Sequence, residues 1–462
     1  MLFKTRGGKH NHVEGIGERT MRRYLKNKAV LKKCHIYQML KRAACRPHFS
    51  FHTPGHKVGR WDITELSFSD NLSCPRGCIA KAEGDIAEIL GAEKSFILTD
   101  GSTSGVLSIL HAARAMGVKK IAFCEASHKS VYNGCALLGL SPLLYPDKKQ
   151  EKIPFAYTMS ALNEEFPSII KEADAIFITS PDYYGNTADW QALRAYCDKE
   201  GKLLLVDGAH GGHLHNKEIY AGRYADMWVD GVHKNLPAFT QGAIVSARTK
   251  ALAEKLRLAV DIFRTTSPSY PIMASVEYAV KYPENTALEN AAMAFIKEWQ
   301  EKGRIYFGGD WTKLCAVFGE SAFDVENALA EQGIYAEFCD GNIVMFYLSP
   351  ATSKRQFAKL KKCLVKQFQK HPILIDKTEK EETQRNPAPF ILEKTMQTEW
   401  VEIEKAEGRI CVISCGLFPP CTPLLKAGER VTKESIALLQ KADNVYGLCD
   451  NKIQVLQEKN EE

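Results

Sequence analysis

The chain has 462 residues, of which 45% are hydrophobic and 25% are charged. These proportions are ordinary for a globular protein and exclude a collagen-like or largely disordered chain. The length suggests about two to three domains of roughly 100–200 residues each. No apolar run approaches the ~20 residues that a membrane-spanning helix needs, so we expect no membrane partner.

The basic residues are concentrated at the N-terminus. Residues 1–50 contain 13 Lys and Arg against 2 Asp and Glu, a net charge of +11, so the remaining 412 residues carry 48 against 53, a net charge of −5. Such an arm could bind nucleic acid or an anionic surface, or serve as a mitochondrial presequence. The simpler prediction is a solvated lysine-rich helix over residues 21–41 in a cytoplasmic protein.

The 14 cysteines make up about 3% of the chain and are scattered along it. The pairs 74/78 and 411/415 have C-x3-C spacing, whereas zinc sites usually use C-x2-C together with further Cys or His ligands. We therefore expect free thiols, as in a reducing compartment, and no metal site.

From residue 85 to about 248, short apolar runs alternate with helical patterns. Strands are predicted at residues 95–99, 120–124, 175–179, 203–207, 226–230 and 243–246, and helices at residues 104–116, 130–138 and 189–200. The strands lack regular polar alternation and are separated by helices of about 10–15 residues. This pattern predicts an α/β fold whose mainly parallel sheet is covered by helices on both faces.

Changes in pattern along the chain predict five segments. A smaller α+β domain follows the major one, with strands at 335–338 and 343–347, and a polar, Pro- and Lys-rich stretch separates it from the last unit. The segments are 1–50 (basic arm or helix), 51–300 (major domain), 301–368 (small α+β domain), 369–399 (linker or exposed excursion) and 400–462 (C-terminal domain).

In a parallel sheet, functional groups gather in the loops after the carboxyl ends of the strands. Residues 100–105 (DGSTSG) follow one strand and open a helix, where glycines, hydroxyls and free N–H groups can hold a phosphate. Ser and Thr before a helix are also common simple caps. His128 follows the next strand, where an imidazole can lie flat over a planar ring, although many loop histidines are ordinary surface residues.

Two further strand ends carry Asp207 and Lys234. A carboxylate that ends a buried strand needs a cationic or donor partner. A desolvated lysine loses its proton more readily, and its neutral amine can attack a carbonyl. His210 and His213 also permit a metal hypothesis, but no further ligand stands at the expected spacing. An anion cradle, a ring cover, an acid and an amine together match the requirements of pyridoxal phosphate.

With these motifs in order, the sequence resembles the fold-type I ornithine/lysine/arginine decarboxylases, especially their shorter Gram-positive members. The resemblance covers about residues 35–455. The motifs that carry it are residues 52–57 (HTPGHK), 100–105 (DGSTSG), 127–130 (SHKS), 180–185 (SPDYYG), 206–213 (VDGAHGGH), 233–241 (HKNLPAFTQ), 265–270 (TTSPSY) and 418–425 (FPPCTPLL).

The resemblance implies a role for each matching residue. Lys234 would bond to the cofactor aldehyde, Asp207 would pair with the pyridine nitrogen, and His128 would stack on the ring. The other implied cofactor-binding residues are Ser102, Thr103, Ser104, His210, His233 and, across a subunit interface, Ser267. The implied reaction removes the α-carboxyl group of arginine, lysine or ornithine as CO2. It would feed polyamine synthesis, in a homodimer or higher homo-oligomer.

The chain also departs from the family pattern. Gly208, Gly231 and Asp182 stand where Glu, Ser and Thr are usual. Gly231 would lack a phosphate-binding hydroxyl, unless a positive φ requires glycine there. Asp182 and Glu429 are candidate partners for the distal cation of the substrate.

The alternatives are another fold-type I enzyme, such as an aminotransferase or lyase, and a weakly active regulatory paralogue. A nucleic-acid binder acting through the basic arm is a further alternative, but the sequence contains no recognised nucleic-acid-binding module.

Overall fold

The protein is described by a computed structural model with a large α/β sheet at its centre. The described residues are 24–45, 49–57, 61–125, 127–145, 149–150, 153–157, 166–372, 397–417, 423–441 and 445–457. None of the helices in these ranges is long and apolar enough to cross a membrane.

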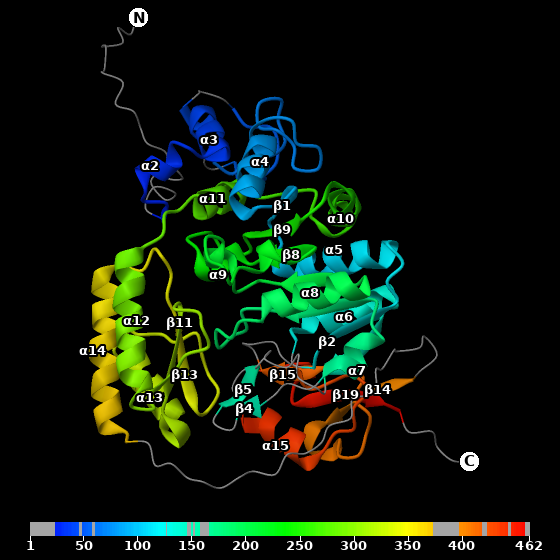
Figure 1. Cartoon of the computed structure of the whole chain (residues 1–462), viewed down its shortest axis with the longest axis vertical. Coiled ribbons are helices and arrows are strands. Elements are labelled where there is room, and N and C mark those ends of the chain that lie inside the picture. Colours follow the sequence, from blue (N-terminus) through cyan, green and yellow to red (C-terminus); the bar gives the residue numbers. More distant parts are fainter. Residues whose placement is uncertain are drawn as a thin grey trace, which may run out of the picture.

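The central sheet has seven strands in the order β1-β9-β8-β7-β6-β2-β3 (Figure 1). The strands from β8 to β3 in this order are parallel, and β9 is antiparallel to both of its neighbours. The predicted α/β fold with a mainly parallel sheet is therefore confirmed. The strands are β1 (Lys94–Leu98), β2 (Lys120–Cys124), β3 (Ser141–Tyr145), β6 (Ala175–Thr179), β7 (Leu203–Asp207), β8 (Met227–Asp230) and β9 (Ala243–Ala247).

Both faces of this sheet are buried, which explains why its strands lack polar alternation. Ile176 and Ile178 of β6 lie in one apolar cluster, which includes residues of α4, α8 and α11. Phe177 points to the other face, where α5, α6 and α10 cover a second cluster. The helices are α4 (Cys78–Leu90), α5 (Ser102–Ala115), α6 (Lys129–Leu138), α8 (Trp190–Glu200), α10 (Lys250–Phe263) and α11 (Tyr270–Val280).

The single solvated helix predicted over residues 21–41 is wrong in its described part. Two helices form instead, α2 (Lys28–Leu31) and α3 (His35–Cys45). The side chain of Asn27 accepts hydrogen bonds from two backbone N–H groups and so starts α2 as a separate helix. Five apolar residues of α3 are buried in the core: Ile36, Tyr37, Met39, Leu40 and Ala43. Residues 1–23, which hold much of the basic arm, lie outside the described residues.

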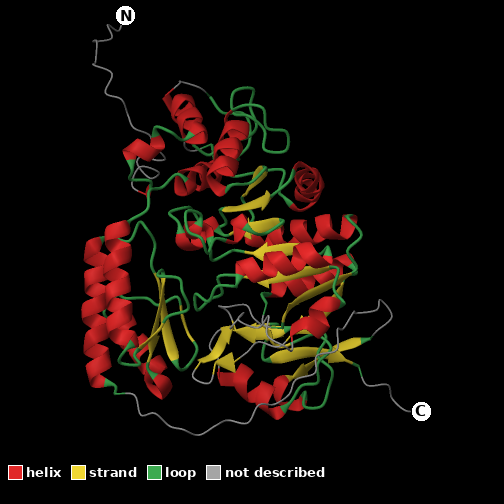
Figure 2. Ribbon diagram, in the orientation of Figure 1, coloured by secondary structure: helices red, strands yellow, loops and turns green. Residues whose placement is uncertain are grey.

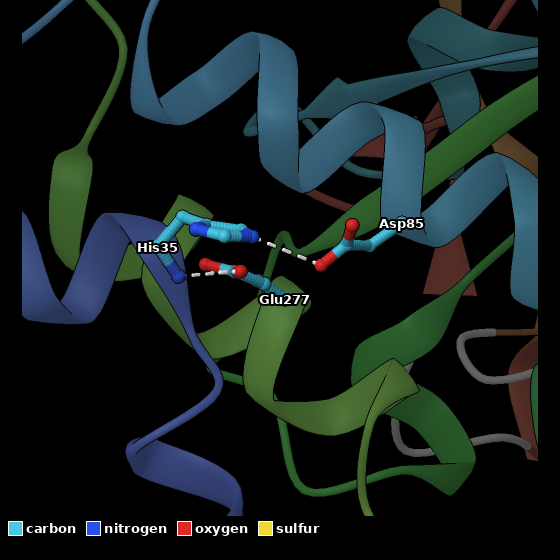
Figure 3. Close-up of side chains that lie close together, drawn as sticks. All are labelled: His35, Asp85 and Glu277. Atoms are coloured by element: carbon cyan, nitrogen blue, oxygen red, sulfur yellow. Dashed lines mark hydrogen bonds and ion pairs between the residues drawn. The ribbon is translucent and has the colours of Figure 1, made fainter.

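Helix α3 is anchored by a charged cluster at its N-terminus (Figure 3). The Glu277 carboxylate accepts hydrogen bonds from the backbone N–H groups of His35 (2.6 Å) and Ile36 (2.9 Å). Asp85 Oδ2 lies 3.0 Å from His35 Nε2. These side chains are close enough to share a metal ion. Lys281 Nζ, however, already lies 2.5 Å from Asp85 Oδ2 and 2.8 Å from Glu277 Oε1, so the carboxylates are compensated by an ammonium group.

A second, four-stranded antiparallel sheet has the order β10-β11-β13-β12 and lies against two long helices that run side by side (Figures 1 and 2). The prediction of a strand at 343–347 is confirmed, but the strand at 335–338 is displaced, because pairing with β13 begins only at Phe338. The elements are β10 (Ile305–Tyr306), β11 (Lys313–Val317), β12 (Phe338–Cys339), β13 (Ile343–Tyr347), α12 (Thr286–Gln300), α13 (Ala322–Ala330) and α14 (Lys354–Lys370).

The C-terminal part forms two three-stranded sheets and one helix below β2 in Figure 1. Lys426 ties it to the central sheet, because its Nζ lies 3.1 Å from Oε2 of Glu125, which follows β2. Residues 373–396 and 418–422 lie outside the described residues. The remaining elements are β4 (Lys149–Gln150), β5 (Ile153–Tyr157), α7 (Phe166–Lys171), β14 (Thr398–Glu402), β15 (Cys415–Leu417), β16 (Pro423–Leu425), α15 (Lys433–Lys441), β17 (Val445–Tyr446), β18 (Leu448–Cys449) and β19 (Lys452–Leu456).

Candidate active site

The loops singled out in the sequence meet at one edge of the central sheet. Strands β1, β2, β6, β7 and β8 all point the same way, so the residues after their carboxyl ends share that edge. The side chains that follow are those of Asp100, His128, Asp182, Asp207 and Lys234.

Lys234 lies on α9 (Val232–Asn235), a single helical turn after β8. Its Nζ is 3.1 Å from His210 Nε2 and 5.7 Å from the centre of the Tyr183 ring. The Nδ1 atom of His210 is 3.3 Å from the hydroxyl of Tyr347. Burial, together with the charges of Lys234 and Lys313, holds the pKa of His210 well below its usual value. His210 is therefore neutral, and its Nε2 can accept a hydrogen bond from the Lys234 ammonium.

Asp207 is buried, with 3% of its surface exposed, at the end of β7. Its Oδ1 accepts a hydrogen bond from the backbone N–H of Ala209 (3.0 Å). Burial raises the pKa of the Asp207 carboxyl, and the charge of Lys234 opposes this rise. A buried carboxylate with such limited compensation suits a cationic ring N–H as its partner.

His128 caps α6, and the cap fixes the plane of its ring. Its Nδ1 accepts a hydrogen bond from the backbone N–H of Ser130 (3.2 Å) and lies 2.8 Å from the Ser130 hydroxyl. Burial, followed by the charges of Lys234 and Lys129, lowers the pKa of His128 to about 3. The ring is therefore neutral, flat and held in place, as a group stacked on an aromatic cofactor must be.

The N-terminus of α5 can accept an anion. Gly101 precedes it with a φ of 79°, and the helix has neither a side-chain cap nor an acidic residue in its first turn. Ser102 and Thr103 lie on that turn, whereas the Ser104 hydroxyl donates to the carbonyl of Gly101 (3.0 Å). The free N–H groups and two hydroxyls of this turn fit a phosphate.

One loop ties this cradle to Lys234. The N–H of Gly101 donates to the carbonyl of Gln241 (2.9 Å), and His233 Nδ1 donates to the neighbouring carbonyl of Gly242 (2.9 Å). Close by, in the part of the chain that the structure describes, Thr99 Oγ1 and Ser127 Oγ are buried without a hydrogen-bond partner. The donors and this unused polar capacity fit a phosphorylated cofactor.

Ser267 lies in the loop between α10 and α11. It is exposed, and its N–H donates to Thr265 Oγ1 (3.1 Å). The N–H of Thr265 in turn donates to Asp100 Oδ2 (3.1 Å), at the start of the phosphate cradle. The predicted reach of Ser267 into a neighbouring subunit stays a prediction.

The two unusual glycines allow the loops after β7 and β8 to touch. Gly231 has a φ of −83°, so the positive-φ explanation is wrong. A Cβ there would lie 2.6 Å from the carbonyl oxygen of Ala209, which leaves no room for a serine. A Cβ on Gly208 would lie 3.0 Å from the carbonyl oxygen of Val229. At both positions a larger side chain would therefore disturb a close backbone contact.

Asp182 does not face the site as a free carboxylate. Its Oδ1 accepts hydrogen bonds from the backbone N–H groups of Tyr184 and Asn186, both at 2.9 Å, and its Oδ2 accepts one from Asn186 Nδ2 (2.8 Å). Asp182 therefore organises the turn after β6. Glu429 remains a candidate, because its Oε2 accepts from the N–H of Lys426 while its Oε1 stays 3.8 Å from Lys426 Nζ.

The sequence did not identify the residues that the small sheet contributes. Lys313 of β11 is fully buried, and Tyr347 of β13 reaches His210. Asp310 accepts a hydrogen bond from His213 Nε2 (2.8 Å), which gives His213 a structural partner. The available signal was the run KLCAV, in which a lysine opens an otherwise apolar strand.

Comparisons with known proteins agree with the family resemblance that the sequence motifs indicate. The family model "Orn/Lys/Arg decarboxylase, major domain" matches residues 34–305. A Bacillus subtilis relative named "Uncharacterized protein YaaO" is 27% identical over 451 residues, which cover 88% of this chain and 93% of the relative. The arginine decarboxylase of the same organism is 24% identical over 459 residues, with the same coverage.

A solved structure of the Escherichia coli constitutive lysine decarboxylase superposes with a TM-score of 0.70 at 18% identity. The match covers 92% of this chain and 82% of that one. The predicted fold-type I architecture is confirmed by this likeness and by weaker ones to other enzymes of the same fold.

Proposed function

The chain belongs to the ornithine/lysine/arginine decarboxylase family, and we propose that it uses pyridoxal phosphate to remove the α-carboxyl group of arginine, lysine or ornithine. One observation carries the proposal: Lys234 Nζ lies 3.1 Å from a neutral imidazole, within the electrostatic reach of the buried Asp207. An amine, a hydrogen-bond acceptor for that amine and a carboxyl group for a ring nitrogen thus occur together.

When bound, pyridoxal phosphate supplies the electron sink for the pair left on the substrate Cα as CO2 departs. Asp207 would hold the ring nitrogen protonated, and His128 would cover one face of the ring. The first turn of α5, with Ser102 and Thr103, would hold the phosphate. His233 stands beside the same loop, with its Nδ1 fixed by Gly242.

His210 orients the amine for reaction. Its Nε2 accepts a hydrogen bond from Lys234, while its Nδ1 proton is directed to the Tyr347 hydroxyl. The Tyr183 ring, 4.4 Å from the His210 ring between centres, fixes the imidazole from the other side. As a neutral amine Lys234 would act as a nucleophile, and as an ammonium it would return a proton to the substrate carbon after loss of CO2.

We propose that acidic groups near the carboxyl end of β2 bind the distal cation of the substrate. Lys426 Nζ is shared by Glu125 (3.1 Å) and Glu429 (3.8 Å), so two carboxylates surround one ammonium. The excess negative charge lies three residues from His128 in the chain, and a guanidinium or ammonium group would neutralise it.

We propose a cytoplasmic homodimer that feeds amines into polyamine synthesis.

The test is direct. Purified protein is incubated with pyridoxal phosphate and each of the three amino acids, and CO2 and amine are measured. We expect one of them to be decarboxylated, and Lys234→Ala to abolish the reaction. The matched control is Lys199→Ala, at an exposed lysine of α8. Absence of CO2 from all three substrates, with the cofactor bound, would reject the decarboxylase.

A further inference from the structure

A second lysine lies behind the site on a different sheet. Lys313 opens β11 and is fully buried. Its Nζ is 3.8 Å from the centre of the Tyr347 ring and 3.9 Å from Asp310 Oδ2. Asp310 is shared, because its other oxygen accepts hydrogen bonds from His213 (2.8 Å) and Thr312 (2.8 Å). The Lys313 ammonium is therefore only partly neutralised by its nearest carboxylate.

Lys313 is connected to α9 through the residue that follows Lys234. With its amide oriented so that both atoms are satisfied, Asn235 accepts a hydrogen bond from Lys313 Nζ at Oδ1 (2.7 Å). Its Nδ2 then donates to the carbonyl oxygen of His210 (2.9 Å). One buried amide thus joins the small sheet, the turn that carries Lys234 and the loop that carries His210.

Lys313 contacts both residues that support the contact between Lys234 and His210, namely Tyr347 and Asn235. The Tyr347 ring lies against Lys313 Nζ, and its hydroxyl contacts His210 Nδ1. Asn235 is held by the Lys313 hydrogen bond, and it ends the turn that aims Lys234 at His210 Nε2. If Lys313 is removed, both supports of the 3.1 Å contact between amine and imidazole are loosened.

We propose that Lys313 is a positioning residue for Lys234: its ammonium fixes the Asn235 amide and thereby holds the Lys234 amine against His210. The inference rests on Lys234 being the reactive amine of the proposed function. Through Lys313, the four-stranded sheet would also take part in the reaction, which the motifs of the central sheet alone do not indicate.

The test measures the amine itself, in cofactor-free protein. Lys234 is acetylated with a low concentration of acetic anhydride, and its rate is read by mass spectrometry against Lys199, an exposed lysine. Lys313→Met should slow acetylation of Lys234 about tenfold, the size expected when a hydrogen bond to a charged group is lost. Asn235→Ala should have a similar effect. The double variant should be no slower than either single one, because both changes break one connection.

Controls separate positioning from general damage. Lys281→Met removes another buried ammonium, one that joins α3, α4 and α11, and should leave the acetylation rate of Lys234 unchanged. Asn235→Asp keeps an acceptor for Lys313 and should retain most of the reactivity that Asn235→Ala loses. This pair decides the question even if Lys313→Met does not fold, as judged by circular dichroism.

Three results would overturn the inference: normal Lys234 reactivity in folded Lys313→Met, effects of Lys313→Met and Asn235→Ala that multiply, or equal losses in Asn235→Asp and Asn235→Ala. Because acetylation needs neither cofactor nor substrate, these results stand apart from the decarboxylation assay. A protein that decarboxylates nothing could still show the coupling, and an active one could lack it.

Discussion

Two buried lysines in this molecule have opposite surroundings. Burial alone would lower the pKa of Lys281, but its hydrogen bonds to Asp85 and Glu277 outweigh burial and raise it. Burial lowers the pKa of Lys313 to about 8, and Asp310 offsets this only in part. The first lysine is fully compensated and anchors a helix. The second is under-compensated, beside another lysine, at the edge where the chemistry is proposed.

The comparison teaches that burial of a charge does not by itself mark a functional site. His35, Asp85 and Glu277 offer three potential metal ligands, yet each has a structural partner (Figure 3). Around Lys234 the buried acid and both imidazoles are instead left with incomplete or neutral partners. Incomplete compensation is costly in a fold and is expected where a charged ligand completes it.

The largest expected effect is a loss of stability when the ion pairs of Lys281 with Asp85 and Glu277 are broken. Lys281→Met leaves the Glu277 carboxylate buried without its ammonium and should lower the free energy of unfolding by about 3–5 kcal/mol. Urea denaturation measures the loss. Turnover per folded molecule should not change, and a selective loss of activity would show that this cluster serves the site.

Asp207→Asn, at the sheet edge that carries Lys234, should lower activity and leave stability almost unchanged. The cofactor ring would lose its anionic partner, so turnover should fall about 100- to 1,000-fold. Stability should change little or rise slightly, because burial already disfavours the Asp207 charge in the cofactor-free protein. Steady-state kinetics and thermal denaturation of the same samples separate the two effects. Near-normal turnover would reduce Asp207 to a structural residue.

Gly231→Ser tests the close contact between the loop after β7 and the loop after β8. The new Cβ would lie 2.6 Å from the carbonyl oxygen of Ala209. We expect a stability loss of about 1–3 kcal/mol, and weaker cofactor binding in a titration of apo-protein with pyridoxal phosphate. Gly231→Ala carries the same Cβ without the hydroxyl and should behave alike. Tighter binding in the serine variant alone would restore the missing-hydroxyl explanation.

The smallest effect concerns Asp230, a buried carboxyl beside Asp207. Burial raises its pKa to about 7, although Tyr220 and Trp228 donate hydrogen bonds to it. Between the ordinary carboxyl pKa and 7 the folded state holds a proton that the unfolded state has lost, so stability falls as pH rises. Asp230→Asn should remove up to about 1.4 kcal/mol of this fall per pH unit. Unfolding curves at pH 5 and 6 measure it, and an unchanged slope would contradict the raised pKa.

The sequence was sufficient to place the candidate residues of the central sheet at one edge. Strand ends share an edge, so Asp207, Lys234 and His128 could be placed together from topology alone. Contacts made across the fold could not be predicted in this way. Lys313 meets Asn235 from 78 positions away, and the clash at Gly231 depends on how closely two loops pack.

The amino-acid composition led to a wrong prediction for the N-terminal region. The lysine-rich stretch indicated one exposed helix, whereas the cap at Asn27 and the bonds from Glu277 to α3 define two helices, of which α3 is packed into the core. Charge counts cannot reveal a distant carboxylate that caps a helix. The division of the chain at residues 51, 301, 369 and 400 stays a prediction.

The central claim is that Lys234 carries the cofactor. Protein incubated with pyridoxal phosphate is reduced with borohydride, digested and mapped by mass spectrometry, with Lys313→Met and Lys281→Met treated in parallel. We predict that the label is fixed on Lys234 in the unaltered chain, more slowly in Lys313→Met and at the normal rate in Lys281→Met. A label fixed on another lysine, or no label at all, would contradict the account.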